Sequence, residues 1–268
     1  MTRDRSLATI LILGGTQDAR ELTIALCASD VARRMRVISS LAGRTASPLI
    51  PPGEVRVGGF GGVDGLITYL QRESVAAVVD ATHPFAAQMS ANAATACALT
   101  RVPLARVERP AWRARAGDRF IAVANIDAAA SRAAEVGRRI FVTVGRRDLA
   151  PFARLVDRFV LVRSIEAPDS ELLPRDGAVV LSRGPFAFDD ELALLRTYAI
   201  DCIVAKNSGG DATSAKLDAA RALGIPVVMI TRPETDPATP VCGDVVSAAA
   251  WIRTTLRARA GATLLGAP

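Results

Sequence analysis

Short runs of apolar residues alternate with longer alanine-rich stretches along the chain. Such runs, bounded by glycine or charged residues, are typical of strands buried on both faces of a parallel sheet. In the first half this pattern predicts strands at 8–13, 36–40, 54–57, 75–80 and 104–108. It predicts helices between them at 18–28, 63–72 and 85–99. This βαβ series indicates a doubly wound α/β sheet.

The segment R-P-A-W-R-A-R-A-G at 109–117 interrupts the alternation, and a second series follows it. The second series predicts strands at 120–124, 140–144, 159–163, 179–182, 202–205 and 227–230. It predicts helices at 126–136, 148–155, 189–198, 213–223 and 245–259. We therefore expect an α/β protein of two Rossmann-like domains, 1–112 and 113–268, with mostly parallel sheets facing a shared cleft. The pattern does not assign the last helix, 245–259, to either domain.

Composition adds a strong preference for arginine to this picture. The formal net charge is +6, and Lys206 and Lys216 are the only lysines, which leaves 31 arginines among the 33 basic residues. A partner or substrate rich in carboxylates or phosphates would explain this, because the guanidinium group matches both. A coding bias towards arginine explains it equally well. Nucleic acid is disfavoured as a partner, because the basic residues are scattered and aromatic residues are few.

Other residue types exclude several functions. The four cysteines form no C-x-x-C pair and the chain has one histidine, so we expect no metal site. The N-terminus has no secretory cleavage signal, and no stretch is long and apolar enough to span a membrane. We therefore expect a cytoplasmic protein without a membrane partner. There is also no phosphate-binding P-loop, no Tyr-x-x-x-Lys and no G-x-S-x-G motif.

A glycine turn follows the first predicted strand and leads into the first helix. Gly14, Gly15 and Thr16 open this turn, and Ala19 and Arg20 follow it. Glycines let the backbone approach a pyrophosphate, and a helix N-terminus attracts that anion. The turn departs from G-x-G-x-x-G, because Thr16 and Ala19 stand at the second and third glycine positions. It predicts a dinucleotide site, and a simple tight βα turn stays open as the alternative.

The ends of the second and third strands bear on the choice of dinucleotide. An NAD site has an acidic residue after the second strand, whereas this chain has Ser39, Ser40 and then Arg44. Hydroxyls and an arginine suit a 2′-phosphate, so the sequence favours NADPH over NADH. Arg44 also fits a solvated loop. Gly58, Gly59 and Phe60 come after the third strand, where we expect the adenosine half of the cofactor.

The segment D-A-T-H-P-F follows the fourth strand, near the expected position of a nicotinamide. Ala81 and Thr82 are candidate cofactor contacts, and Pro84 and Phe85 are candidate substrate contacts. His83, the single histidine, titrates near neutrality and suits a general acid. A structural histidine at a strand end remains the alternative.

Three segments in the second half place polar or charged residues after predicted strands. Arg146, Arg183 and Lys206 would together surround one anionic ligand, although each also suits the cap of a helix. The same segments supply the remaining candidate substrate contacts, Ser182, Gly184, Asn207, Ser208 and Gly209.

Taken together, the chain resembles the precorrin-6A and cobalt-precorrin-6A reductases of corrin-ring biosynthesis. The resemblance rests on L-I-L-G-G-T-Q-D-A-R at 11–20 and V-D-A-T-H-P-F-A at 79–86. R-x-E-R-P-x-W, S-R-G-P-F and K-N-S-G-G extend it over nearly the whole chain. One departure concerns the lysine loop, which in this family is often followed by more glycines but here continues as Asp211-Ala212-Thr213.

The resemblance implies an NADPH-dependent reduction of a ring-contracted tetrapyrrole, with hydride to one ring carbon and a proton to its neighbour. It implies that the glycine turn and the 39–44 loop hold NADPH, and that Thr82 and His83 lie near the nicotinamide. Arg183, Gly184, Lys206, Asn207 and Ser208 would face the polycarboxylate macrocycle. No motif identifies the proton donor, so His83 and Lys206 both stay candidates. Neighbouring pathway enzymes are a further expected kind of partner.

Two other functions fit the paired α/β domains. One is a nucleotide-sugar glycosyltransferase with two Rossmann-like domains. The other is a nucleotide-binding module without catalysis. The acid-free end of the second predicted strand favours NADPH over a nucleotide sugar.

Overall fold

The computed structural model describes residues 7–28, 35–43 and 49–265, with the backbone alone for 260–265. The chain forms two compact units, of which unit 1 is Met1–Arg109 with Pro233–Pro268 and unit 2 is Pro110–Arg232. The first boundary lies close to the expected one after residue 112. The second domain was expected to continue to residue 268, whereas the chain from Pro233 onward belongs to unit 1. The last helix therefore packs in unit 1.

The sheet of unit 1 contains six strands, and every neighbouring pair is parallel. Their order is β12-β5-β4-β1-β2-β3. The strands are β1 (Ala8–Leu13), β2 (Met35–Leu41), β3 (Glu54–Val57), β4 (Val75–Asp80), β5 (Leu104–Val107) and β12 (Val241–Cys242). The first five agree with the predicted strands to within a residue or so, whereas β12 lies between residues 231 and 244, where the pattern predicted neither a strand nor a helix.

Unit 2 also has a six-stranded sheet whose neighbouring strands all run parallel. Its order is β6-β11-β10-β7-β8-β9. The strands are β6 (Phe120–Val123), β7 (Arg139–Val142), β8 (Phe159–Ser164), β9 (Gly177–Leu181), β10 (Cys202–Lys206) and β11 (Val227–Ile230). The prediction of an α/β protein with two parallel sheets is therefore confirmed.

The two sheets have exchanged their sixth strands. Read from β3 to β12, the first sheet has the 3-2-1-4-5-6 order of dinucleotide-binding folds, with β12 in the sixth position. Read from β9 to β6, the second sheet has the same order, with β6 sixth. In two consecutive domains β6 would complete the first sheet and β12 the second. Here each strand completes the other sheet.

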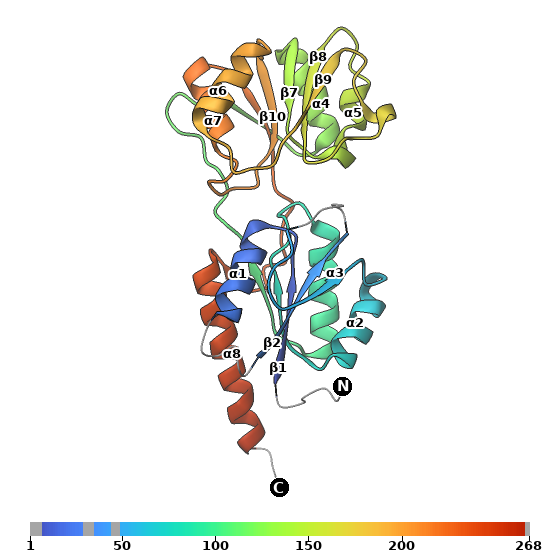
Figure 1. Ribbon diagram of the computed structural model, residues 1–268, viewed down its shortest axis with the longest axis vertical. Coiled ribbons are helices and arrows are strands. Elements are labelled where there is room, and N and C mark those ends of the chain that lie inside the picture. The colour runs from blue at the N-terminus through green and yellow to red at the C-terminus, as the bar shows by residue number, and fades with distance from the viewer. Residues whose placement is uncertain (1–6, 29–34, 44–48, 266–268) are drawn as a thin grey trace. The chain divides into compact units, whose positions relative to one another are not determined.

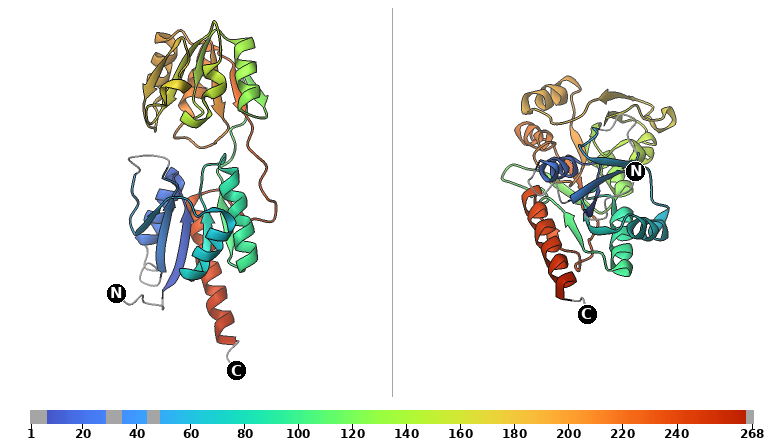
Figure 2. Two further views of the ribbon diagram at one scale, coloured as in Figure 1. Left: turned by 90° about the vertical axis from the view of Figure 1, so that its right-hand side faces the viewer. Right: turned by 60° about the horizontal axis from the view of Figure 1, so that its bottom comes forward.

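The helices of unit 1 cover both faces of its sheet. In Figure 1, α1 and α8 lie on one face and α2 and α3 on the other, and Figure 2 also shows α8, in red, beside α1. These helices are α1 (Gln17–Cys27), α2 (Gly62–Arg72), α3 (Ala87–Thr100) and α8 (Val245–Leu265). Helix α3 begins two residues later than predicted, so Pro84 and Phe85 belong to the preceding loop.

Strand β1 shows why the buried strands are apolar at every position. Ile10 and Ile12 pack towards Leu22 of α1 and Ile252 of α8, whereas Leu11 packs with the residues of α2 and α3. Successive side chains of a strand point to opposite faces, and here both faces are covered by helices. Transfer of each such side chain from water contributes about 1.5–3 kcal/mol.

Unit 2 has the same layered construction. Its helices are α4 (Ile126–Val136), the short α5 (Ala150–Ala153), α6 (Phe188–Thr197) and α7 (Ala215–Leu223). Short 3-10 turns occupy Arg146–Asp148 and Ser170–Leu172, so the helix predicted at 148–155 is shorter than expected. The core between the sheet and α6 and α7 contains Phe141, Leu195 and Leu217, all almost fully buried.

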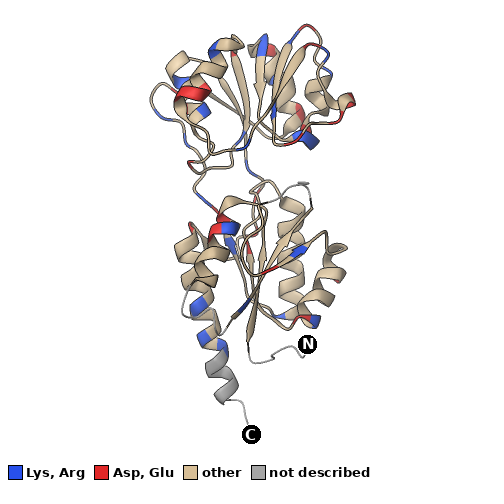
Figure 3. Ribbon diagram, in the orientation of Figure 1, with Lys and Arg blue, Asp and Glu red and all other residues tan. Residues whose placement is uncertain are grey.

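Figure 3 shows Lys and Arg spread over both units, with Asp and Glu near several of them. Among the described residues, no helix combines the length and apolar character needed to cross a membrane.

Candidate active site

The glycine turn after β1 is closely packed. The amide of Gly14 donates to the carbonyl oxygen of Ser40 at 2.9 Å, and a Cβ atom on Gly14 would lie 3.2 Å from that of Ala19. Gly15 has φ of +108°, a conformation that side chains disfavour, and open space surrounds its Cα. The turn therefore brings backbone, without side chains, to the carboxyl end of the sheet.

Thr16 joins this turn to the loop after β4. Its Oγ1 accepts a hydrogen bond from the Ala19 amide at 3.1 Å and thereby caps α1. The same hydroxyl donates to the Ala81 carbonyl oxygen at 2.7 Å. Two segments that are 65 residues apart are thus held together at one edge of the sheet.

The first turn of α1 contains a partly buried acid. Asp18 forms an ion pair with Arg109, with 3.0 Å between Oδ2 and Nε. Burial raises the pKa of Asp18, and the charge of Arg109 opposes that rise. The pairing places a cation beside the acid, which limits repulsion of an anion at this helix end. Arg20, another candidate cofactor contact, is exposed on the same helix.

The predicted ribose contacts have different environments. Ser39 is 2% exposed and its hydroxyl lies 2.9 Å from that of Thr23, so it is engaged with α1 inside the unit. Ser40 accepts a hydrogen bond from Arg56 at 3.0 Å. Arg44 lies outside the described residues, so its predicted role stays a prediction.

Arg56 on β3 is a candidate that the sequence did not single out. Its Nη1 donates to the Gly58 carbonyl and its Nη2 to the Gly59 carbonyl, each at 2.6 Å. Its guanidinium carbon lies 3.7 Å from the centre of the Phe60 ring. The arginine thus orders the glycine loop after β3. What marks Arg56 as a candidate is its position opposite Ser40 in the register of β2 and β3. That register is known only from the folded structure, so the sequence did not reveal it.

The loop after β4 is held by Asp80. This carboxylate is 2% exposed, and its Oδ1 accepts hydrogen bonds from the amide and the hydroxyl of Thr82, at 3.0 and 2.6 Å. His83 is exposed, and its Nδ1 accepts from the Phe85 amide at 3.2 Å. A neutral His83 ring in this arrangement carries its proton on Nε2.

Arg106 on the neighbouring strand β5 contacts the same loop. It is 4% exposed, and its Nη1 lies 3.6 Å from Oδ2 of Asp80. Its Nε pairs with Glu108 at 2.9 Å, and its Nη2 makes a long contact of 3.4 Å with the Pro84 carbonyl oxygen. A buried cation requires such partners, because desolvation of an unpaired charge is costly.

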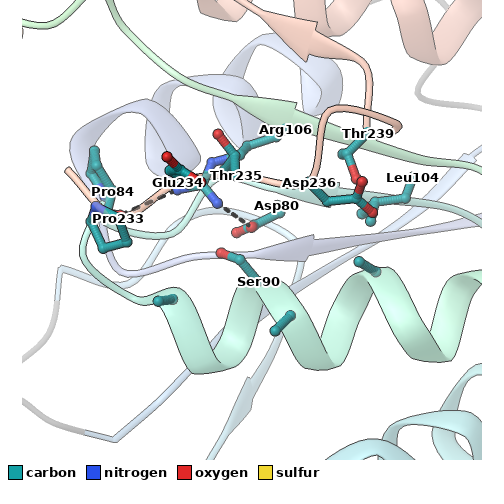
Figure 4. Close-up of a pocket in the computed structure, with 13 residues that line it drawn as sticks. Asp80, Pro84, Ser90, Leu104, Arg106, Pro233, Glu234, Thr235, Asp236 and Thr239 are labelled. Atoms are coloured by element: carbon teal, nitrogen blue, oxygen red, sulfur yellow. Dashed lines mark hydrogen bonds and ion pairs between the residues drawn. The ribbon is translucent and has the colours of Figure 1, made fainter.

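A cavity of about 110 Å³ adjoins this network in unit 1. Asp80 and Ser90 point into it from β4 and α3, and Pro84 also lines it (Figure 4). The segment after Pro233 closes its other side with Glu234 and Asp236. Within the described chain, Oδ2 of Asp80 and Oγ of Ser90 make no hydrogen bond. A cavity of this size with such polar groups in its wall accommodates water.

The predicted substrate contacts of unit 2 lie at or beyond the carboxyl ends of its strands. Arg146 pairs with Glu166 at 3.1 Å, and Nζ of Lys206 lies 2.6 Å from Oδ2 of Asp148. Within the described part of the chain, the Ser182 hydroxyl is buried without a hydrogen-bond partner. Arg183 and Gly184 come next, and the Gly184–Pro185 peptide bond is cis.

The K-N-S-G-G loop docks on Trp112. The Asn207 side chain accepts from the Trp112 amide at 2.8 Å and donates to its carbonyl at 3.0 Å, so both ends of the side-chain amide are engaged. Gly209 has φ of +67°, and a Cβ atom there would lie 2.2 Å from the Pro110 carbonyl oxygen. Between them lies Ser208, whose amide donates to the Lys206 carbonyl. Asn207 and Gly209 thus have clear structural roles, and their substrate contacts stay predictions.

Lys216 on α7, like Arg56, is a residue whose environment the sequence did not reveal. It is 5% exposed, and burial lowers its pKa to about 8. Its Nζ donates to the Thr213 carbonyl and lies 4.9 Å from the Trp112 ring. It therefore supports the loop that follows β10. No cluster of three His, Cys, Asp or Glu suited to a metal ion occurs in the described ranges.

The residues at the carboxyl end of the unit 1 sheet fit a phosphorylated dinucleotide. Gly15 leaves space where a Cβ atom would stand, α1 begins directly behind it, and Arg56 adds a cation at the ends of β2 and β3. The contacts of the individual residues with a cofactor or substrate stay predictions.

Comparison with known proteins identifies the family. The family model described as precorrin-6x reductase CbiJ/CobK matches residues 9–253. A precorrin-6A reductase of Rhodococcus erythropolis is 49% identical, covering 94% of this chain and 100% of that protein. A cobalt-precorrin-6A reductase of Priestia megaterium is 31% identical, covering 86% of this chain and 92% of that protein.

A solved structure of CobK precorrin-6A reductase has the same fold. It superposes with a TM-score of 0.86 at 41% identity, covering 93% of this chain and 97% of that one. These matches favour neither a glycosyltransferase nor a non-catalytic nucleotide-binding module. The chain belongs to the precorrin-6A reductase family.

Proposed function

We propose that this protein reduces precorrin-6A or a close relative during cobalamin biosynthesis, with NADPH as the reductant. Membership of the family supports the reaction class. The observation that carries the assignment to a site is the hydrogen bond between Thr16 and Ala81. It joins the phosphate-binding turn to the D-A-T-H-P-F loop, and a dinucleotide needs both at one sheet edge.

The N-terminal end of α1 would hold the pyrophosphate of NADPH. Gly15 allows close approach of the pyrophosphate, Gly14 allows the turn to pack on α1, and the helix dipole favours the anion. Ala19 packs beneath the turn and is 5% exposed, so its role is to keep the turn close to the helix. When bound, NADPH supplies the hydride that is transferred to one ring carbon of the tetrapyrrole.

The loop after β4 would lie beside the nicotinamide and keep it in place. Asp80 fixes the backbone of this loop through its hydrogen bond with the Thr82 amide, and Arg106 pairs with Asp80. Thr16 fixes the loop through its hydrogen bond to Ala81. Hydride transfer requires a closely defined donor–acceptor geometry, so a rigid loop serves the reaction. Thr82 and Ala81 belong to this support, with their polar groups already engaged.

Unit 2 would bind the acidic side chains of the tetrapyrrole. Lys206 is the last residue of β10, and Arg146 and Arg183 follow β7 and β9. Guanidinium groups recognise carboxylates with two parallel hydrogen bonds. Arg146 and Lys206 are paired with Glu166 and Asp148. Substrate carboxylates would compete with these two acids for the cations.

His83 is our first candidate for delivering the proton to the neighbouring ring carbon. It is exposed at the end of the loop, and its Nε2 is directed away from the Nδ1 contact with Phe85. Lys206 remains the second candidate. Its 2.6 Å ion pair with Asp148 favours a binding role, because the ammonium is held by a carboxylate.

The test is anaerobic turnover of the purified protein with NADPH and precorrin-6A, monitored by absorbance and mass spectrometry of the product. The proposal expects NADPH oxidation with the gain of two hydrogen atoms by the tetrapyrrole. Parallel reactions with the cobalt-containing tetrapyrrole show whether the substrate is metal-free or contains cobalt. Reactions with NADH in place of NADPH show which cofactor is used. Absence of product from both tetrapyrroles would refute the function.

A further inference from the structure

Arg56 is a cation placed where two strand ends meet. It lies opposite Ser40 in the parallel register of β2 and β3, and its Nη1 donates to the Ser40 hydroxyl at 3.0 Å. Its other hydrogen bonds go to the carbonyl oxygens of Gly58 and Gly59. The Phe60 ring lies against the guanidinium. The arginine is thus held in one orientation by neutral groups.

The charge of Arg56 has no counter-ion among the described residues. Arg36, on the neighbouring strand, provides the contrast, because it pairs with both Glu54 and Glu73. Partial burial lowers the pKa of Arg56, and the nearby charge of Arg72 lowers it further. Within the described part of the chain, the Nε–H of Arg56 also makes no hydrogen bond. A fixed cation with an unused donor is suited to an anionic ligand.

The position of Arg56 in the fold indicates which part of a ligand it would meet. In dinucleotide-binding sheets the adenosine ribose lies beyond the end of the second strand, and an arginine nearby accommodates a 2′-phosphate. Ser40 is the penultimate residue of β2, and Arg56 contacts it directly. Gly58 and Gly59 have no heavy atom within 4 Å of an added Cβ, so they leave room for a ligand.

We propose that Arg56 binds the 2′-phosphate of NADPH and sets the preference of this enzyme for NADPH over NADH. This inference rests on the proposed use of a nicotinamide dinucleotide. It differs from the sequence-based expectation, which placed the same role on Arg44. The competing interpretations are that Arg56 only orders the glycine loop, or that it binds a carboxylate of the tetrapyrrole.

Calorimetric titration of the full-length protein separates these interpretations. The ligands are NADP⁺, NAD⁺, 2′,5′-ADP and 5′-AMP, so the 2′-phosphate is the single difference within each pair. The variants are Arg56→Gln, which removes the charge, and Arg56→Lys, which keeps it. Arg72→Gln is the matched control, because it removes a neighbouring arginine charge whose side chain is 63% exposed.

For Arg56→Gln we expect the Kd of NADP⁺ and 2′,5′-ADP to rise about tenfold to a hundredfold. The Kd of NAD⁺ and 5′-AMP should change less than about twofold, since no charged contact is lost. Arg56→Lys should keep most of the preference, and Arg72→Gln should keep all of it. Circular dichroism and thermal melting show whether each variant is folded.

Three results would overturn the inference. Equal weakening of all four ligands would show that Arg56 only orders the loop. Unchanged nucleotide binding with a raised KM for the tetrapyrrole would assign Arg56 to the substrate. If Arg56→Gln does not fold, equal weakening of all four ligands by a folded Arg56→Lys would overturn the inference in the same way. Failure of the wild-type protein to bind any dinucleotide would instead refute the proposed cofactor.

Discussion

The hydroxyl of Thr16 donates to the carbonyl oxygen of Ala81 at 2.7 Å and also accepts from the first turn of α1. One side chain therefore fixes the helix start, the glycine turn and the loop after β4. In a nicotinamide-dependent enzyme these are the parts that hold the pyrophosphate and the reactive ring. The first prediction concerns this hydroxyl.

Replacement of Thr16 by valine keeps the shape and removes both hydrogen bonds. We expect a loss of about 1–2 kcal/mol in the free energy of unfolding, together with weaker NADP⁺ binding. Urea unfolding and calorimetry measure the two effects. Thr95→Val is the control, because the Thr95 hydroxyl bonds only to the Ala91 carbonyl within α3. Equal effects in both variants would contradict a special role for Thr16.

Arg106→Met should destabilise the protein by about 3–5 kcal/mol, because it leaves the buried Asp80 carboxylate without its ion pair. Combining it with Asp80→Asn should recover part of that loss, since the remaining partner is then uncharged. Urea unfolding of the two single variants and the double variant measures the coupling. Strictly additive effects would show that the 3.6 Å contact contributes nothing.

His83→Ala tests the proton donor. We expect kcat to fall by about 10²-fold or more, the contribution typical of a general acid, with little change in the Kd of NADP⁺. Lys206→Met, measured in parallel, should chiefly raise the KM for the tetrapyrrole, since it removes a proposed carboxylate contact. Wild-type turnover by His83→Ala would give His83 a structural role.

Gly209→Ala should disrupt the loop on Trp112. Its Cβ atom would lie 2.2 Å from the Pro110 carbonyl oxygen, in addition to the cost of φ at +67°. Gly224→Ala is a matched control, because Gly224 has the same φ but open space around it. We expect the control to cost about 1 kcal/mol and Gly209→Ala to cost clearly more. Equal losses in urea unfolding would show that the loop adapts.

Lys216 predicts a pH dependence of stability. Burial lowers its pKa from 10.5 to about 8, so below pH 8 it is protonated in both the folded and the unfolded state. Between about pH 8 and 10.5 only the unfolded state keeps the proton, and the free energy of unfolding contributed by Lys216 rises with pH. Urea unfolding of wild type and Lys216→Met should show this rise in their difference. A flat difference would contradict it.

The sequence predicted the strands well because their signal is local. Strand β4, at Val75–Asp80, is apolar until its final residue, and the polar loop follows at once. Helix α1 was equally clear, because Thr16 caps it directly after the glycine turn. Such features depend on a few neighbouring residues, so no knowledge of the tertiary structure is needed.

Features that depend on distant contacts were missed or misjudged. Strand β12 contains only Val241 and Cys242 between turn residues, and it exists because β5 offers an open edge. Arg56 was missed because its position beside Ser40 follows from the register of two strands. The substrate contact of Asn207 stays a prediction, but its hydrogen bonds to Trp112 were missed, because the two residues lie 95 positions apart in the sequence.

The exchange of β6 and β12 has a consequence for the order in which the protein folds during its synthesis. The first five strands of unit 1 leave the ribosome early, but the edge of β5 stays uncovered until residues 241–242 have been made. By then the whole of unit 2 has been synthesised. An exposed strand edge favours pairing with other chains, so the nascent protein carries an aggregation risk while unit 2 is being synthesised.

The same exchange means that no single cut of the chain yields two complete sheets. A fragment ending before Pro110 would lack β12 and α8. The other fragment would contain β12 and α8 but not β5, with which β12 pairs, or the rest of the unit 1 sheet. The chain therefore passes between the two units twice, at Arg109–Pro110 and at Arg232–Pro233, and unit 1 is complete only when its two separate segments have come together.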